Sequence, residues 1–77
     1  MTTLEQLQAI VREHTGDDDL VIEPQTQLSD DMGLDSYDLA LILAAVEEHF
    51  DIDISYQAAM QLQNAADVVA YIEQLTK

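Results

Sequence analysis

Three scarcities limit what this chain can do: it has no cysteine, few basic residues and few aromatic residues. Without cysteine it can form neither disulfide bonds nor thiolate metal sites, so any thiol chemistry would have to arrive on a prosthetic group. Arg12 and Lys77 are the only basic side chains against 16 acidic ones, which gives a formal net charge of −14. Nucleic acid and anionic membrane surfaces would repel such a chain, so we expect neither as a partner. Basic protein surfaces are the expected partners, and the alternative is that the acids simply keep a small protein soluble.

The low aromatic content also bears on the fold class. Aromatic residues make up 5% of the chain and hydrophobic residues 48%, most of them aliphatic or alanine. This mixture is more typical of helical packing than of a β-sandwich, which is richer in valine, threonine and aromatic residues. A chain of 77 residues forms one domain, residues 1–77, and a domain of this size buries only about 60% of the surface that its unfolded form exposes. Little room therefore remains for an enclosed catalytic cleft.

No segment of the sequence has the features of a membrane span or a secretory signal. The longest apolar run, from Leu39 to Val46, is too short to cross a bilayer. Met1 leads directly into TTLEQL, without a basic region or a long apolar stretch behind it. We therefore expect a soluble cytoplasmic protein, and a monomer.

Apolar periodicity predicts four helices, at about residues 3–14, 35–50, 55–62 and 65–76. The residues expected to cap them are Thr2 or Thr3, Asp35 and Asn64, with Gly16 ending the first helix. Asp38, three residues after Asp35, gives a pair that resembles a capping box. The side chains expected to face the core are Leu4, Leu7, Ile10 and Val11 in the first helix, Leu39, Ile42, Leu43, Val46 and Phe50 in the second, and Val68, Val69, Ile72 and Leu75 in the fourth.

Residues 16–35 form a long connection between the first two helices. A loop of this length inside a compact domain is usually either functional or the result of a misassigned element. Its apolar residues have no helical spacing, and we expect them to pack back onto the helices; they are Leu20, Ile22, Leu28, Met32 and Leu34. The predicted architecture is all-α: a small four-helix bundle with a long first loop and a short third helix.

Ser36 stands out because it opens the longest apolar helix between two aspartates, in the run GLDSYDLALIL. If Asp35 is the N-cap, Ser36 is the first helical residue, so its hydroxyl has no capping role and projects into solvent. The unpaired N–H groups and the positive dipole end of a helix favour a phosphate there. The position therefore suits the attachment of a phosphodiester, although a plain helix-start serine remains an alternative on these grounds alone.

A serine nucleophile is a poor interpretation of the same residue. Such an enzyme needs a hydrogen-bonded base and an oxyanion hole, and His14 and His49 are the only histidines. His49 lies on the same helix, roughly 20 Å from Ser36 at the rise of an α-helix. The flanking residues also differ from the G-x-S-x-G nucleophile elbow.

The segments DMGLDSYDL (31–39) and VEEHFDIDI (46–54) resemble the acyl carrier proteins. The signature of that family is Asp-Ser-Leu after a short glycine-containing turn, at the start of the second helix of a four-helix bundle. The likeness covers nearly the whole chain, including its size, its acidity, the long first loop, the short third helix and the final amphipathic helix. It implies that Ser36 carries 4′-phosphopantetheine, installed from coenzyme A by a phosphopantetheinyl transferase, with Asp35 as the helix cap beside it.

The resemblance also implies how such a protein works. The thiol of the arm would hold acyl intermediates as thioesters, and the protein itself would not catalyse. Its partners would be loading ligases or synthases of fatty-acid, polyketide or specialised acyl pathways, with basic docking patches. The residues expected to meet them are Tyr37, Asp38, Leu41, Ala44, Glu47 and Glu48. The family can also shelter an acyl chain between its helices, and Ala40, Ala44 and Ala45 are small residues that would leave space for it.

Three departures from the family pattern favour a specialised carrier over a general fatty-acid carrier. Tyr37 stands where leucine is usual, Leu41 stands where an acid is frequent, and the segment YQAAMQL (56–62) contains no acid. Other hypotheses remain open: an aminoacyl, peptidyl or D-alanyl carrier, or an acidic helical adaptor whose serine is unmodified. A calcium sensor is a weaker one, because the aspartate pairs and triplets do not match an EF-hand loop, so no metal site is expected beyond weak divalent binding.

The charge imbalance leads to a prediction about stability. Added salt, or millimolar magnesium, should raise the melting temperature, because screening weakens the repulsion between negative charges within a small volume. Thermal unfolding followed by circular dichroism across a series of salt concentrations measures the effect. A flat response to both additives would show that repulsion between the acids does not limit stability.

Overall fold

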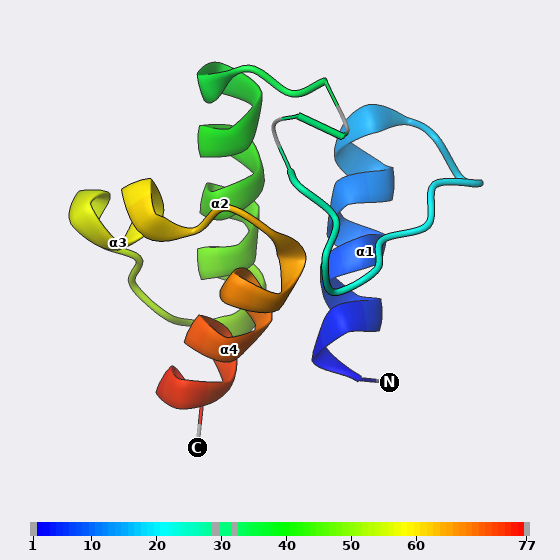
Figure 1. Cartoon of the computed structure of the whole chain (residues 1–77). Coiled ribbons are helices and arrows are strands. Elements are labelled where there is room, and N and C mark those ends of the chain that lie inside the picture. The colour runs from blue at the N-terminus through cyan, green and yellow to red at the C-terminus, as the bar shows by residue number, and fades with distance from the viewer. Residues whose placement is uncertain (1, 29, 32, 77) are drawn as a thin grey trace.

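The computed structural model describes residues 2–28, 30, 31 and 33–76, and it contains four helices: α1 (Thr3–Thr15), α2 (Ser36–Phe50), α3 (Tyr56–Gln61) and α4 (Ala65–Leu75). The predicted all-α class and the order of helices are thus confirmed. α1 packs against both α2 and α4, whereas the short α3 lies on the side of α2 that faces away from α1 in Figure 1. The described residues include no strand, and their one β-bridge joins Gln27 to Asn64.

The helix starts follow from local capping. Thr2 caps α1, and its backbone N–H donates to Glu5 while the backbone N–H of Glu5 donates to the Thr2 side chain, which completes a capping box. Asn64 and Asp67 form the same reciprocal pair at the start of α4. Asp35 caps α2 as predicted, by accepting the backbone N–H of Asp38 at 2.8 Å.

The C-terminus of α1 is set by Gly16. Its φ of +76° lies in the left-handed region, where glycine has no Cβ penalty, and its N–H donates to the carbonyl of Arg12. The predicted helix stop is therefore confirmed.

Side chains from three helices and the first loop share one core. The buried apolar residues are Leu7, Ile10, Val11, Ile22, Leu28, Ile42, Leu43, Val46, Ala65, Val68 and Ile72. Leu4, Leu39, Phe50 and Val69 are partly buried against them, as their helical spacing predicted. The prediction for Leu75 is wrong: it is 47% exposed, because it is the last residue of α4 and lies beyond Ile72, the last buried residue of that helix.

The long first loop is part of the core, as predicted. Ile22 and Leu28 are buried, and Leu20 and Leu34 are partly buried against the core; Met32 lies outside the described residues. Polar contacts fix the same loop to its neighbours. The backbone N–H of Ile22 donates to Gln8 of α1 at 2.8 Å.

The second half of the loop is tied to the start of α4. The carbonyls of Pro24 and Thr26 accept the backbone N–H groups of Ala66 and Ala65, at 2.8 and 3.0 Å. The backbone N–H of Leu28 donates to the carbonyl of Gln63 at 3.2 Å. The bonds from Ala65 and Ala66 satisfy N–H groups in the first turn of α4 that have no partner within the helix.

The capping box of α1 predicts a pH dependence of stability. The pKa of Glu5 is lowered from its ordinary value. The larger cause is that its carboxylate accepts the backbone N–H of Thr2, and the smaller is a hydrogen bond with the Thr2 side chain. Because the pKa of Glu5 is lower in the folded state than in the unfolded state, the ionised carboxylate stabilises the fold. This contribution to stability is fully present above the unfolded-state pKa of about 4.3, and it is lost as pH falls through the folded-state pKa.

The measurement for this prediction is a thermal melt of the parent chain and of Glu5→Gln at a series of pH values. The parent should be the more stable of the two at neutral pH, and the difference should shrink below a pH of about 4. A difference in melting temperature that stays constant across this range would contradict the assignment to the Glu5 carboxylate.

Candidate functional site

Ser36 is the first residue of α2, and its side chain is exposed. The cap belongs to Asp35, whose carboxylate accepts the backbone N–H of Asp38, so the Ser36 hydroxyl has no capping role. Gly33 turns the chain just before the helix with a φ of +66°, and a Cβ built there would meet no atom within 4 Å. The hydroxyl therefore stands at an open helix N-terminus, where backbone N–H groups and the helix dipole favour a phosphate.

The two histidines contact residues other than Ser36. His14, near the C-terminus of α1, places its Nε2 3.5 Å from an Asp38 carboxylate oxygen in the first turn of α2. His49 lies at the far end of α2, with Nε2 3.1 Å from the amide oxygen of Gln6. Sequence reasoning could not place His14, because its position near the start of α2 depends on how α1 packs. Since both imidazoles are engaged elsewhere, the arrangement does not form the hydrogen-bonded serine and base of a hydrolase.

The six residues expected to meet partners divide into two groups. Four lie along one exposed stripe of α2 at helical spacing: Tyr37, Leu41, Ala44 and Glu48. Tyr37 is 70% exposed and Leu41 is 42% exposed, so an exposed apolar patch follows Ser36 along the helix. We call these four residues the α2 stripe.

The other two residues point away from the α2 stripe. Asp38 contacts His14 of α1. Glu47 is half-buried, and its Oε2 accepts the backbone N–H of Ile54 at 2.9 Å. Because this bond fixes the connection between α2 and α3, Glu47 has a structural role that its sequence position did not reveal.

The suggestion that small residues on α2 leave interior space for an acyl chain is not supported. Ala40, Ala44 and Ala45 are all exposed. The residues of α2 that are buried in the core are Ile42, Leu43 and Val46 instead. Ala45 lines an open groove between α1 and α2, which the sequence analysis did not anticipate.

The clusters of aspartate do not assemble into a metal centre in the part of the chain that the structure describes. No group of three or more histidine, cysteine, aspartate or glutamate side chains there is arranged to hold a metal ion. In the first cluster, Asp17 uses its Oδ1 to accept the backbone N–H of Asp19 at 3.1 Å, closing a local turn. Nor is any described helix long and apolar enough to span a bilayer.

A second exposed apolar surface, on α3, was not predicted from the sequence. Tyr56 and Met60 are both exposed on α3, at a spacing of four residues that puts them on one face of the helix. That spacing was the available signal, but a helix of six residues is too short for its buried and exposed faces to be told apart from the sequence.

Comparison with known proteins identifies the family of this chain. The acyl carrier protein of Solidesulfovibrio magneticus is 34% identical over 95% of this chain and 94% of its own length. That of Helicobacter pylori is 36% identical over the same shares of the two chains. The family profile described as "Phosphopantetheine attachment site" matches residues 5–72. The chain belongs to the acyl carrier protein family.

Solved structures agree with this assignment. The solution structure of a holo acyl carrier protein from Geobacter metallireducens superposes with a TM-score of 0.84 at 26% identity, covering 96% of this chain and 85% of that one. The acyl carrier protein of Enterococcus faecalis gives a TM-score of 0.73 at 25% identity, covering 96% and 98%.

The family assignment fixes the chemistry in outline. This protein is a carrier and not a catalyst, and its prosthetic group is 4′-phosphopantetheine. When bound, the group supplies the thiol that this cysteine-free chain lacks. An exposed hydroxyl at the first position of α2 suits the attachment of a phosphodiester.

Proposed function

We propose that Ser36 bears the phosphopantetheine of this carrier and that the α2 stripe is where its partner enzymes dock. The observation that carries the first part is the exposed Ser36 hydroxyl at the first position of α2, with the cap supplied by Asp35. In the attachment reaction the Ser36 oxygen forms a bond to the β-phosphorus of coenzyme A. The bond to adenosine 3′,5′-bisphosphate breaks, and the hydroxyl proton passes to a base of the transferase.

The experiment that tests attachment is incubation of the unmodified, folded chain with coenzyme A and a broad-specificity phosphopantetheinyl transferase, followed by intact mass and peptide mapping. A gain of one phosphopantetheine on the peptide containing Ser36 supports the proposal. A gain on another peptide would refute the assignment to Ser36, and no gain from the folded chain would count against it.

We infer a specialised acyl or polyketide pathway for the cargo. The α2 stripe presents Tyr37 and Leu41 to solvent, and α3 adds exposed Tyr56 and Met60 without an acid. A partner for such a surface needs apolar contacts as well as cations, whereas rim charges mainly set association rate and salt dependence. Loading assays that compare acyl with aminoacyl substrates separate this pathway from that of a peptidyl or D-alanyl carrier.

Charge also supports a proposal about assembly. Two copies of a chain with a net charge of −14 repel each other, so we propose a monomer. Sedimentation at low ionic strength and at physiological ionic strength would reveal a dimer if one forms.

The docking proposal predicts the effect of one substitution. Tyr37→Ala should lower kcat/KM with the transferase, because an exposed aromatic side chain next to the modified residue is the kind of contact that dominates interface energies. Tyr71→Ala is the control, since Tyr71 lies on α4; its side chain is partly buried, so a thermal melt of each variant accompanies the rates. Equal rates for the parent and Tyr37→Ala would remove Tyr37 from the docking face.

A further inference from the structure

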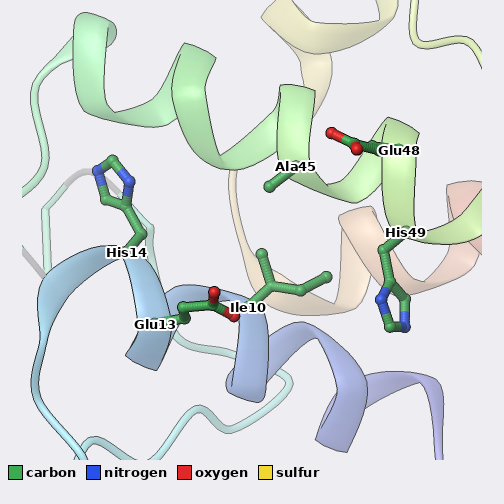
Figure 2. A pocket seen from close by; sticks show the side chains of 6 residues that line it. All are labelled: Ile10, Glu13, His14, Ala45, Glu48 and His49. Carbon is green, nitrogen blue, oxygen red and sulfur yellow. The ribbon is translucent and has the colours of Figure 1, made fainter.

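The two histidines join α1 to α2 at opposite ends of this antiparallel pair of helices (Figure 1). Nε2 of His14, in the last turn of α1, lies 3.5 Å from a carboxylate oxygen of Asp38, in the first turn of α2. Nε2 of His49, in the last turn of α2, lies 3.1 Å from the amide oxygen of Gln6 on α1. An open groove of about 530 Å³ lies between the helices, with one imidazole at each end (Figure 2). The two contacts differ in one respect, because His14 has a charged partner and His49 an uncharged one.

The surroundings of His14 are acidic. Glu13 of α1 and Glu48 of α2 line the same groove, and its described lining includes no lysine or arginine. The side chains of His14 and Asp38 are 24% and 39% exposed, so water screens a charge on the imidazole only in part. A positive charge at the C-terminus of α1 and a negative one at the N-terminus of α2 also have the signs that the helix dipoles favour. Among the described residues this pair is the one ion pair.

We propose that His14 and Asp38 form a pH-sensitive clasp that holds the Ser36 end of α2 against α1. Histidine is the side chain that ordinarily gains a proton as pH falls from 8 to 5. With the proton, an imidazolium faces the Asp38 carboxylate and the two attract; without it, this attraction is lost. The clasp therefore tightens as pH falls through this range and loosens as pH rises. Asp38 transmits the effect to the start of α2, since its backbone N–H donates to the Asp35 cap at 2.8 Å.

The test is a double-mutant cycle of His14→Gln and Asp38→Asn, with melting temperatures measured at about pH 5.5 and about pH 8.5 and at constant ionic strength. Glutamine and asparagine keep a polar side chain and carry no charge at either pH. At the lower pH, the coupling between the two positions should amount to about 2–6 °C in melting temperature, as for one partly exposed ion pair in a domain of this size. At the higher pH, the coupling should vanish, because a neutral imidazole no longer attracts the carboxylate.

His49→Gln is the matched control. His49 lies at the other end of the same groove and contacts the uncharged amide of Gln6. Its protonation also reduces the net negative charge of the chain, and thus the general repulsion between the acids, but it closes no ion pair with Asp38. A cycle of His49→Gln with Asp38→Asn should therefore give no coupling at either pH, which separates the clasp from a general relief of repulsion.

A pH titration of the unmodified parent chain gives a second readout that needs no variant to fold. The backbone N–H groups of Asp38 and Leu39 both donate to Asp35, so their signals in ¹H–¹⁵N spectra should move together with the signal of the His14 ring. Three outcomes would overturn the inference: a coupling that is absent at the lower pH or equal at both, an equal coupling for His49, or amide signals that do not follow the ring. The clasp does not depend on whether Ser36 is modified, so its failure would leave the attachment proposal standing.

Discussion

Ser36→Ala should abolish the gain of phosphopantetheine completely, while the chain keeps its fold. The substitution removes the one atom that the proposal assigns to the phosphodiester bond. The helix should tolerate it, because Asp35 makes the capping contact and alanine is the best helix former at a position that needs no cap. Its effect on the free energy of unfolding should stay within about 0.5 kcal/mol, as for surface substitutions in general. Intact mass after incubation with coenzyme A and the transferase, paired with a thermal melt, measures both effects.

Ser55→Ala is the informative control for this experiment. Ser55 is also a helix-start serine, but its hydroxyl caps α3 by accepting the backbone N–H of Ala58 at 3.1 Å. Its loss should cost about 1 kcal/mol of stability and leave the modification intact. Modification that persists in Ser36→Ala would refute the assignment of the site. A Ser36→Ala chain that is unmodified because it is unfolded would be recognised from the melt, and Ser36→Thr, which keeps a hydroxyl at this position, then tests the site in a second background.

Leu28→Ala should produce the largest loss of stability that we predict, although Leu28 lies in a loop. Its side chain is 1% exposed within the core, and removing such a buried leucine side chain typically costs about 2–5 kcal/mol. Domains are stable by only about 5–15 kcal/mol, and small ones lie toward the lower end. We therefore expect a substantial unfolded fraction at physiological temperature and a slower overall rate of modification. Urea unfolding monitored by circular dichroism gives the free energy directly.

The same loop offers a matched control, because Val21 is 65% exposed while its neighbour Ile22 is buried. Val21→Ala should change the free energy of unfolding by no more than about 0.5 kcal/mol. If Leu28→Ala and Val21→Ala behaved alike, the first loop would not be part of the core, and its role in holding the start of α4 would have to be abandoned.

The helices could be predicted from the sequence because the interactions that define their ends join residues close together in the chain. The caps at Asp35 and Asn64 and the stop at Gly16 depend on residues a few positions away, so the sequence contains the whole signal. Leu75 was misplaced because its exposure depends on where other elements end, and helical periodicity alone cannot report that.

The surface residues of α2 show where such reasoning stops. Tyr37, Leu41, Ala44, Glu47 and Glu48 belong to one helix, yet Glu47 accepts the backbone N–H of Ile54 while the others remain exposed. That contact depends on the path of the chain after α2, which no helical pattern encodes. The same holds for His14, since only the packing of α1 brings it within 3.5 Å of Asp38.

The sequence by itself determined the number and order of the helices, the attachment serine as a candidate and the family resemblance, because each rests on local capping, periodicity or a contiguous motif. The tertiary structure decided which side chains of α2 face solvent, how residues of the first loop enter the core, and that Glu13 and Glu48 line one groove. These features depend on contacts between residues far apart in the chain. Their positions are fixed only when the helices pack to bury their apolar faces.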